Sequence, residues 1–332
     1  MAIRLLEVYH SPDEKVDFKE LLGKIEVIDL RHLKVSRSEV LTRILLPAGE
    51  TEKAVETLDR CFSKDGKYRI IISSPEATIP RPQTEEAPPH KKEEKGEIVS
   101  IEEVYQDIAD RVRPSLYYYV FVFLSAIVAS VGILYNNVAV IIGSMVIAPL
   151  LTPNMGLSLG TTLADRDLMK SSLITGLTGY AVAFAVGVVF GVLFGVDPRS
   201  PEILSRIDLS LMYVLLALAC GVAGSLSLVE GAAQPFVGVM IAVALLPPLV
   251  AGGLLFGSGR FPEALRAVFL FLINVVSINL AGVLTFLLQG ITPRKWWERR
   301  KAKKVVKRAI ILWLAVLAVI VAIILLYEYT KK

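Results

Sequence analysis

The sequence predicts an α-helical polytopic membrane protein that carries an α+β ferredoxin-like soluble domain at its N-terminus. Hydrophobic residues make up 54% of the 332 residues and the mean hydropathy is +0.56, which is unusually apolar for a soluble chain. Charged residues are frequent up to residue 115 and scarce from 116 to 289. In the apolar part, a set of motifs recurs at one fixed spacing. This recurrence predicts an inverted 3+3 helix repeat with discontinuous helices, followed by a seventh span.

The soluble domain is predicted to occupy residues 1–75. Apolar residues alternate in its strand-like segments and recur at helical spacing in the segments between them, in the order βαββαβ. This order is typical of the ferredoxin-like, split βαβ arrangement. The expected strands are 3–9, 25–33, 40–46 and 68–72, and the expected helices are 13–22 and 51–62.

Two segments are expected to join this domain to the membrane. Residues 76–97 are rich in Pro, Glu and Lys, a composition that buries too little apolar surface to fold and therefore predicts a linker. Residues 98–114 are predicted to contain a short amphipathic helix beside the membrane. Ser100 and Glu103 have the spacing of a capping box at its start.

The membrane domain is predicted to extend over residues 115–290, and a basic cytoplasmic segment with a last transmembrane helix over 291–332. A helix needs about 20 apolar residues to cross the hydrocarbon core. Lys and Arg are concentrated between Arg294 and Arg308, which favours a cell-membrane protein with its N-terminus in the cytoplasm and its C-terminus outside. The expected spans are 116–135, 138–162, 168–195, 208–229, 235–257, 267–289 and 309–327.

The internal repeat rests on residues that recur 95 positions apart. Met145 and Met240 are one such pair, and Pro153 and Pro248 are another. Gly143 matches Gly238 at the same offset, in the shared pattern G-x-M-[VI]-x-x-x-L-L-x-P. Three spans separate the matched segments, and an odd number of crossings reverses direction. The two halves are therefore expected to be inverted with respect to each other.

Prolines in both halves predict helix breaks at equivalent depths. Pro149 and Pro153 lie within the second expected span, and Pro247 and Pro248 within the fifth. Proline removes a backbone donor, and in lipid the freed carbonyl must find another partner. The alternative is that these prolines only kink packed helices.

Uncharged polar residues near the predicted breaks are the candidate substrate-binding groups. They could coordinate a sodium ion or a polar solute, or they could hold helices together. The charged residues close to the spans could gate or couple transport, or they could simply be solvated. The candidate binding residues are Asn136, Asn137, Ser144, Thr152, Asn154, Ser158, Asn274, Ser277 and Asn279, and the candidate gating residues are Glu230, Asp165 and Arg166.

Several functional classes are not expected. The spans contain no histidine and no nucleophile–base pair, so we predict no enzyme, no catalytic residue and no cofactor. The two cysteines, Cys61 and Cys220, form no metal-binding pattern, and no metal site is expected. A net charge of +4 does not indicate a nucleic-acid partner. The expected partners are the lipid bilayer, a small solute or ion, and further copies of the chain.

Three stretches resemble a widespread archaeal and bacterial family of multi-pass membrane proteins, classed only as a hydrophobic domain of unknown function. The resemblance covers the membrane region to about Gln289, and the N-terminal module is also similar to the one that family members carry. It implies membrane localisation and brings no activity. The stretches are SAIVASVGILYNNVAVIIGSMVIAPLLTPNMGLSLGT, GVAGSLSLVEGAAQPFVGVMIAVALLPPLVAGG and NVVSINLAGV.

Together these features predict a secondary transporter or channel-like protein for a small solute or ion, with a cytoplasmic regulatory or assembly domain. The alternative is a non-transporting membrane sensor or scaffold whose soluble domain binds a small ligand. Small residues at Gly221, Gly224 and Ser225 form a face that suits helix packing in a homo-oligomer.

Overall fold

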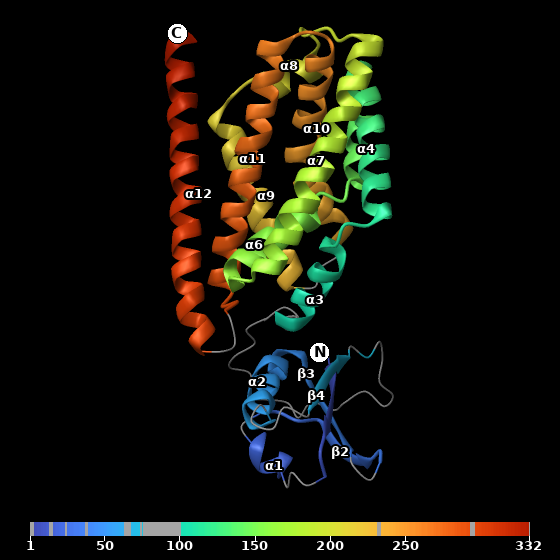
Figure 1. Ribbon diagram of the computed structural model, residues 1–332, viewed down its shortest axis with the longest axis vertical. Helices are drawn as coiled ribbons and strands as arrows, with labels where there is room; N and C mark the ends of the chain where they lie inside the picture. The colour runs from blue at the N-terminus through green and yellow to red at the C-terminus, as the bar shows by residue number, and fades with distance from the viewer. Residues whose placement is uncertain are drawn as a thin grey trace, which may run out of the picture. The chain divides into compact units, whose positions relative to one another are not determined.

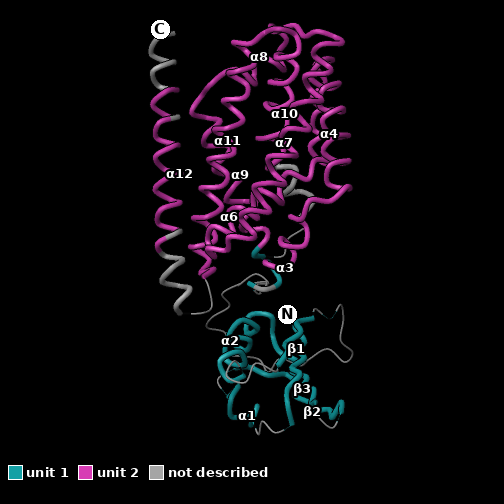
Figure 2. The backbone as a smooth tube through the Cα atoms, in the orientation of Figure 1, with its two compact units in different colours: residues 1–104, 229–231 teal, residues 105–228, 232–332 magenta. Residues whose placement is uncertain are grey.

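The computed structural model describes residues 3–12, 16–23, 25–36, 39–62, 68–73, 75, 101–230, 234–292 and 296–331. The chain forms two compact units (Figure 2). The first comprises residues 1–104 with 229–231, and the second comprises 105–228 with 232–332. The linker expected at 76–97 lies outside the described residues, as does Ser100.

The first unit is a four-stranded antiparallel sheet with two helices. Its strands lie in the order β2-β3-β1-β4. Alternate residues of β1 and β3, such as Leu6 and Ile44, pack with Leu58 and Phe62 of α2 in one apolar core. The elements are β1 Ile3–His10, α1 Phe18–Leu21, β2 Asp29–Lys34, β3 Val40–Pro47, the 3-10 helix η1 Ala48–Glu50, α2 Thr51–Phe62 and β4 Arg69–Ser73.

Helix α1 begins later than the sequence predicts. Asp17 has an extended backbone, and its Oδ1 accepts hydrogen bonds from the amides of Lys19 (2.9 Å) and Glu20 (3.2 Å). An aspartate in this position caps a helix and so marks its first turn. The expected start at residue 13 falls outside the described residues. Strand β2 is also shorter than expected and begins at Asp29.

The second unit consists of helices, several of them long and apolar enough to cross a membrane (Figure 1). Four complete helices and residues Val306–Ile324 of a fifth meet this criterion among the described residues, and α5 with α6 forms a bent sixth candidate. The helices are α3 Ile101–Val112, α4 Leu116–Leu134, α5 Val138–Ile147, α6 Leu151–Leu163, α7 Arg166–Phe194, α8 Pro201–Ile207, α9 Leu211–Val229, α10 Gln234–Gly257, α11 Phe261–Leu288 and α12 Trp296–Lys331. The first four residues of α3 and the last residue of α9 are counted with the first unit.

Helix ends recur at the spacing of the sequence motifs. Helix α4 runs from Leu116 to Leu134 and α9 from Leu211 to Val229, so both ends differ by 95. Helices α7 and α11 begin at Arg166 and Phe261, again 95 residues apart. The offset therefore relates whole helices as well as short motifs.

The two proline pairs behave differently. Pro149 lies between α5 and α6, whose axes meet at 52°. Pro153 is the third residue of α6, where its missing N–H costs no helical hydrogen bond. Helix α10 continues through Pro247 and Pro248, so the break expected there is wrong. Asn274 of α11 supplies part of the reason, because its Nδ2 donates to the Ala244 carbonyl (2.6 Å), which the imide nitrogen of Pro248 cannot serve.

Close packing against α7 also holds α10 in place. A Cβ added at Gly187 of α7 would lie 2.7 Å from the Val250 carbonyl oxygen, and one at Gly253 of α10 would lie 2.5 Å from the Phe184 carbonyl oxygen. The two backbones are therefore in direct contact, as is common where small residues line a membrane helix interface.

Candidate functional site

A group of buried polar side chains lies next to the break between α5 and α6. Asn154 is in the first turn of α6, and its Nδ2 donates to the Leu150 carbonyl (2.8 Å) and to Tyr180 Oη of α7 (2.7 Å). The break therefore directs one amide side chain both to its own backbone and to a neighbouring helix.

Helix α11 completes this group. Asn279 donates through Nδ2 to Asn154 Oδ1 (3.0 Å) and to the Val275 carbonyl (2.8 Å). Ser158, one turn beyond Asn154, has its Oγ 3.1 Å from the Asn154 carbonyl oxygen and 3.2 Å from Asn279 Oδ1. We call Asn154, Ser158, Tyr180 and Asn279 the polar cluster; it joins α6, α7 and α11.

The polar cluster is neutral and is surrounded by apolar helices. Asn154 and Asn279 are 2% and 0% exposed, and Ser158 is fully buried. Tyr180 packs edge-on against Phe271, with ring centroids 4.9 Å apart. Amides and hydroxyls both donate and accept hydrogen bonds. The cluster can therefore exchange a mutual hydrogen bond for one to a polar solute without moving a charge.

A glycine brings α11 close to this group. A Cβ at Gly282 would lie 2.6 Å from Ser158 Oγ and 3.3 Å from Ser225 Oγ of α9. No side chain larger than hydrogen fits there without moving Ser158. The close approach of α6 and α11 thus depends on a small residue at the crossing.

Asn274 and Ser277 lie apart from the polar cluster, although they belong to the same helix as Asn279. Asn274 faces Ala244 of α10 through the hydrogen bond described above. Among the described residues, its Oδ1 and the Ser277 Oγ are buried without a hydrogen-bond partner. Two of the three polar residues expected on α11 are therefore directed to the proline-containing part of α10 or left unpaired.

Ser144 supports the end of α5. Its Oγ donates to the Ile141 carbonyl (2.6 Å), and its own carbonyl accepts from Ser125 Oγ of α4 (2.7 Å). Its hydrogen bonds therefore go to the helix end that leads into the break. Thr152 is half-buried in the first turn of α6.

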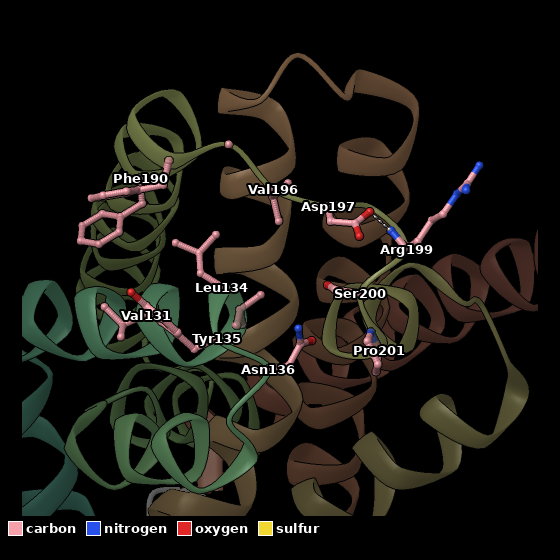
Figure 3. Close-up of a pocket in the computed structure, with 13 residues that line it drawn as sticks. Val131, Leu134, Tyr135, Asn136, Phe190, Val196, Asp197, Arg199, Ser200 and Pro201 are labelled. Atoms are coloured by element: carbon pink, nitrogen blue, oxygen red, sulfur yellow. Dashed lines mark hydrogen bonds between the residues drawn. The ribbon is translucent and has the colours of Figure 1, made fainter.

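Asn136 and Asn137 lie at the other end of α5, away from the break. Asn137 caps α5 by accepting from the Val140 amide (3.2 Å). Asn136 has a left-handed backbone (φ 50°), and its Oδ1 accepts from the Glu202 amide (3.3 Å). Figure 3 shows Asn136 at a hollow of about 1010 Å³ between the ends of α4 and α7 and the 195–201 segment.

The expected gating residues have separate roles in the structure. Asp165 caps α7 by accepting from the amides of Asp167 and Leu168 (both 3.0 Å), and its Oδ2 accepts from Tyr105 Oη of α3 (2.7 Å). This hydrogen bond, with burial and the negative charge of Asp165, raises the pKa of Tyr105 to about 12. Arg166 and Glu230 are exposed, at the start of α7 and just after α9.

Sequence reasoning missed Tyr180. Tyr180 stands near the middle of the 29-residue helix α7. A hydroxyl-bearing aromatic at that depth must find a partner inside the protein, and this is the signal that could have identified it. Ser125 was also missed. Its partner is a backbone carbonyl on another helix, which the sequence does not indicate.

No group of three or more metal-ligating side chains gathers within the described ranges. The polar cluster holds only amide and hydroxyl groups. Its chemistry is therefore that of hydrogen bonding and weak oxygen coordination.

Comparisons with known proteins match the chain to a family and to a relative. Residues 145–280 match the model described as "Domain of unknown function (DUF389)". The chain is 37% identical over 325 residues to a protein of Methanocaldococcus jannaschii named uncharacterized protein MJ0678, covering 98% of this chain and 99% of that protein. No solved structure matches the chain.

Proposed function

The chain belongs to the DUF389 family, and from this premise we propose that it is a secondary transporter or channel-like protein for a small solute or ion. The observation that carries the proposal is the polar cluster beside the interrupted helix α5–α6. Helix breaks deep in membrane proteins are tolerated where they are buried in protein or line a polar cavity. In secondary transporters they contribute to the substrate site.

The polar cluster has the capacity to receive a ligand. Asn154 and Asn279 use their amides on each other and on backbone carbonyls. Tyr180 Oη accepts from Asn154, and its own proton has no acceptor among the described residues. A solute oxygen that takes this proton would be held between three helices.

We further propose that the membrane part is an inverted repeat. The 95-residue offset that relates α4 to α9 and α7 to α11 supports this. In Figure 1 the chain ascends through α7 and descends through α11, as inversion requires. The site need not be symmetric, because only the first half has its helix interrupted.

The N-terminal unit is proposed to be a ferredoxin-like regulatory or assembly domain in the cytoplasm. The strand order β2-β3-β1-β4 with antiparallel pairing supports the ferredoxin-like assignment. The concentration of Lys and Arg between Arg294 and Arg308 supports the cytoplasmic location. A homo-oligomer in the lipid bilayer is part of the same proposal.

Flux through liposomes tests the transport proposal. The full chain is reconstituted and the uptake of sodium, potassium, chloride and small polar metabolites is measured. Tyr180→Phe removes only the hydroxyl of the polar cluster and should reduce uptake at least severalfold. Tyr118→Phe is the matched control, because the Tyr118 hydroxyl is buried without a described partner. Uptake unaffected by Tyr180→Phe, or absent for every solute, would count against transport.

The alternative function is a sensor or scaffold. The mutual pairing of the polar cluster favours it, because such pairing can serve packing alone. A ligand that raises the melting temperature of the full chain, but not of a chain lacking residues 1–96, would place the receptor in the soluble unit and favour this function.

A further inference from the structure

Two histidines of the first unit share one threonine hydroxyl. His10 of β1 has its Nε2 3.0 Å from Thr42 Oγ1 of β3, and His32 of β2 has its Nδ1 2.9 Å from the same oxygen. The other ring nitrogen of His10, Nδ1, is 3.0 Å from the Ser11 carbonyl oxygen. These contacts form a chain from a backbone carbonyl to His32.

The positions of the protons along this chain follow from the acceptors. A carbonyl oxygen only accepts, so His10 Nδ1 must carry a proton. His10 is 6% exposed and packs against the rings of Phe18 and Phe62. A neutral His10 protonated at Nδ1 accepts at Nε2, so the Thr42 hydroxyl donates to it. Thr42 Oγ1 then accepts from His32, which places the His32 proton on Nδ1.

In a neutral His32 ring the other nitrogen, Nε2, then carries a lone pair and no proton. The His32 ring is exposed, and Nε2 has no hydrogen bond to any described residue. His32 lines a pocket of about 570 Å³ together with Val16, Asp17, Phe18, Lys19 and Leu30. The buried relay through Thr42 and His10 therefore presents a fixed acceptor at this pocket, in the way that a second hydrogen bond orients a functional histidine.

The other lining residues narrow the class of ligand. The Asp17 carboxylate uses Oδ1 to cap α1, and Oδ2 has no hydrogen bond within the described residues. Lys19 lines the same pocket, and Val16, Phe18 and Leu30 supply its apolar surface. A ligand that satisfies every part has an ammonium group for Asp17 and His32, a carboxylate for Lys19, and an apolar side chain for Val16 and Leu30.

A metal ion fits this pocket less well. The pocket offers one imidazole and one carboxylate beside a cationic lysine, and no cluster of three metal-ligating groups occurs in the described residues. A zwitterion uses both charges of the pocket, whereas a cation would be opposed by Lys19.

The geometry points to a binding site for an apolar α-amino acid in the N-terminal unit, in which His32 Nε2 accepts a hydrogen bond from the ligand ammonium group. This proposal does not rest on transport through the membrane unit. Binding of the amino acid can be measured without measuring flux. The relay makes Thr42 a positioning residue. It holds His32 in the tautomer that can accept.

Three related compounds test the ligand class. L-leucine, 4-methylpentanoate and 3-methylbutylamine share one apolar group, and the second and third lack the amine and the carboxylate respectively. Titration calorimetry and thermal unfolding of the full-length protein should show binding of L-leucine alone. Equal binding of either analogue, or no binding of L-leucine and the other apolar amino acids, would overturn the proposal.

Three variants test the relay. Thr42→Val removes the shared hydroxyl without changing the shape of the residue, and should weaken L-leucine binding by about tenfold, the worth of one hydrogen bond. Thr42→Ser keeps a hydroxyl and should restore binding. His90→Gln is the control for a histidine outside the relay and should bind as the unmodified protein does.

The His32 tautomer can also be measured directly, which separates loss of the relay from misfolding of a variant. Nitrogen NMR of the full-length protein labelled in its histidine rings, with His32→Gln for assignment, should show a proton on His32 Nδ1. A proton on Nε2 instead, or unchanged L-leucine affinity in a folded Thr42→Val protein, would overturn the proposal.

Discussion

At the scale of single residues, buried polar side chains donate hydrogen bonds to backbone carbonyls that have no amide partner near a proline or at a helix end. Asn274 serves a carbonyl of α10 that Pro248 cannot serve, and Ser125 donates to the Ser144 carbonyl at the end of α5. The sequence showed these residues as polar groups inside apolar spans. It did not show which carbonyl each would meet, because the partners are 30 and 19 positions away and belong to other helices.

Asn274 provides the first prediction. Asn274→Ala leaves the Ala244 carbonyl without its side-chain donor and should destabilise the protein by about 1–3 kcal/mol. Ser277→Ala, one turn further along α11, removes a hydroxyl with no described partner and should cost far less. Unfolding in a detergent series compares the two. Equal losses would show that Asn274 acts only by filling space.

Tyr105 provides a prediction about pH. Its pKa is raised to about 12 by the hydrogen bond to Asp165, so the bond contributes stability below the ordinary tyrosine value of about 10 and loses it as pH rises through 12. The melting temperature of the protein should exceed that of Tyr105→Phe by a constant margin from pH 7 to 9, and the margin should shrink by pH 11. In Asp165→Asn the main cause of the raised pKa is gone, so the loss of this margin between pH 10 and 12 should be smaller. A margin that grows above pH 10 would contradict this assignment.

At the scale of elements, helix existence was predictable and helix continuity was not. Each of the seven expected spans contains a helix or the bent pair α5–α6, because apolar length alone selects helices in lipid. Prolines at similar depths in the two halves suggested two breaks, and only Pro149 lies at one. The difference depends on tertiary packing, since α10 lies directly against α7 and receives the Asn274 side chain. Three of the four residues of the polar cluster were predicted, because Asn154, Ser158 and Asn279 were candidates and Tyr180 was not.

The contact between α7 and α10 can be tested with alanine. Alanine favours a helix over glycine by about 1 kcal/mol, so Gly→Ala stabilises a helix wherever there is room. Gly143 has nothing within 4 Å of the added Cβ, whereas at Gly187 the new carbon would lie 2.7 Å from the Val250 carbonyl oxygen. We therefore expect Gly187→Ala to lower the melting temperature and Gly143→Ala to leave it equal or higher. A neutral Gly187→Ala would mean that the two helices separate easily.

At the scale of the whole molecule, the number of membrane crossings decides on which sides of the bilayer the two ends of the chain lie. Helices α4, α7, α9, α10, α11 and α12, with the bent pair α5–α6, would give seven crossings if each spans the bilayer. An odd number places the two ends of the chain on opposite sides. By the positive-inside rule, the concentration of Lys and Arg between Arg294 and Arg308 supports the proposal that the N-terminal end is cytoplasmic.

This topology makes the last prediction. In intact cells, a reporter that is active only outside the membrane should work when fused after Lys332, and should be inactive when fused before Met1. A third fusion in the segment 293–295, between α11 and α12, shows which helix fails to cross if the expected result is not obtained. If the C-terminal fusion is inactive and the 293–295 fusion is also inactive, α12 does not cross and its apolar length lies against the bundle. If the 293–295 fusion is active, the bent pair α5–α6 enters and leaves on one side, and the two halves of the membrane unit are not inverted.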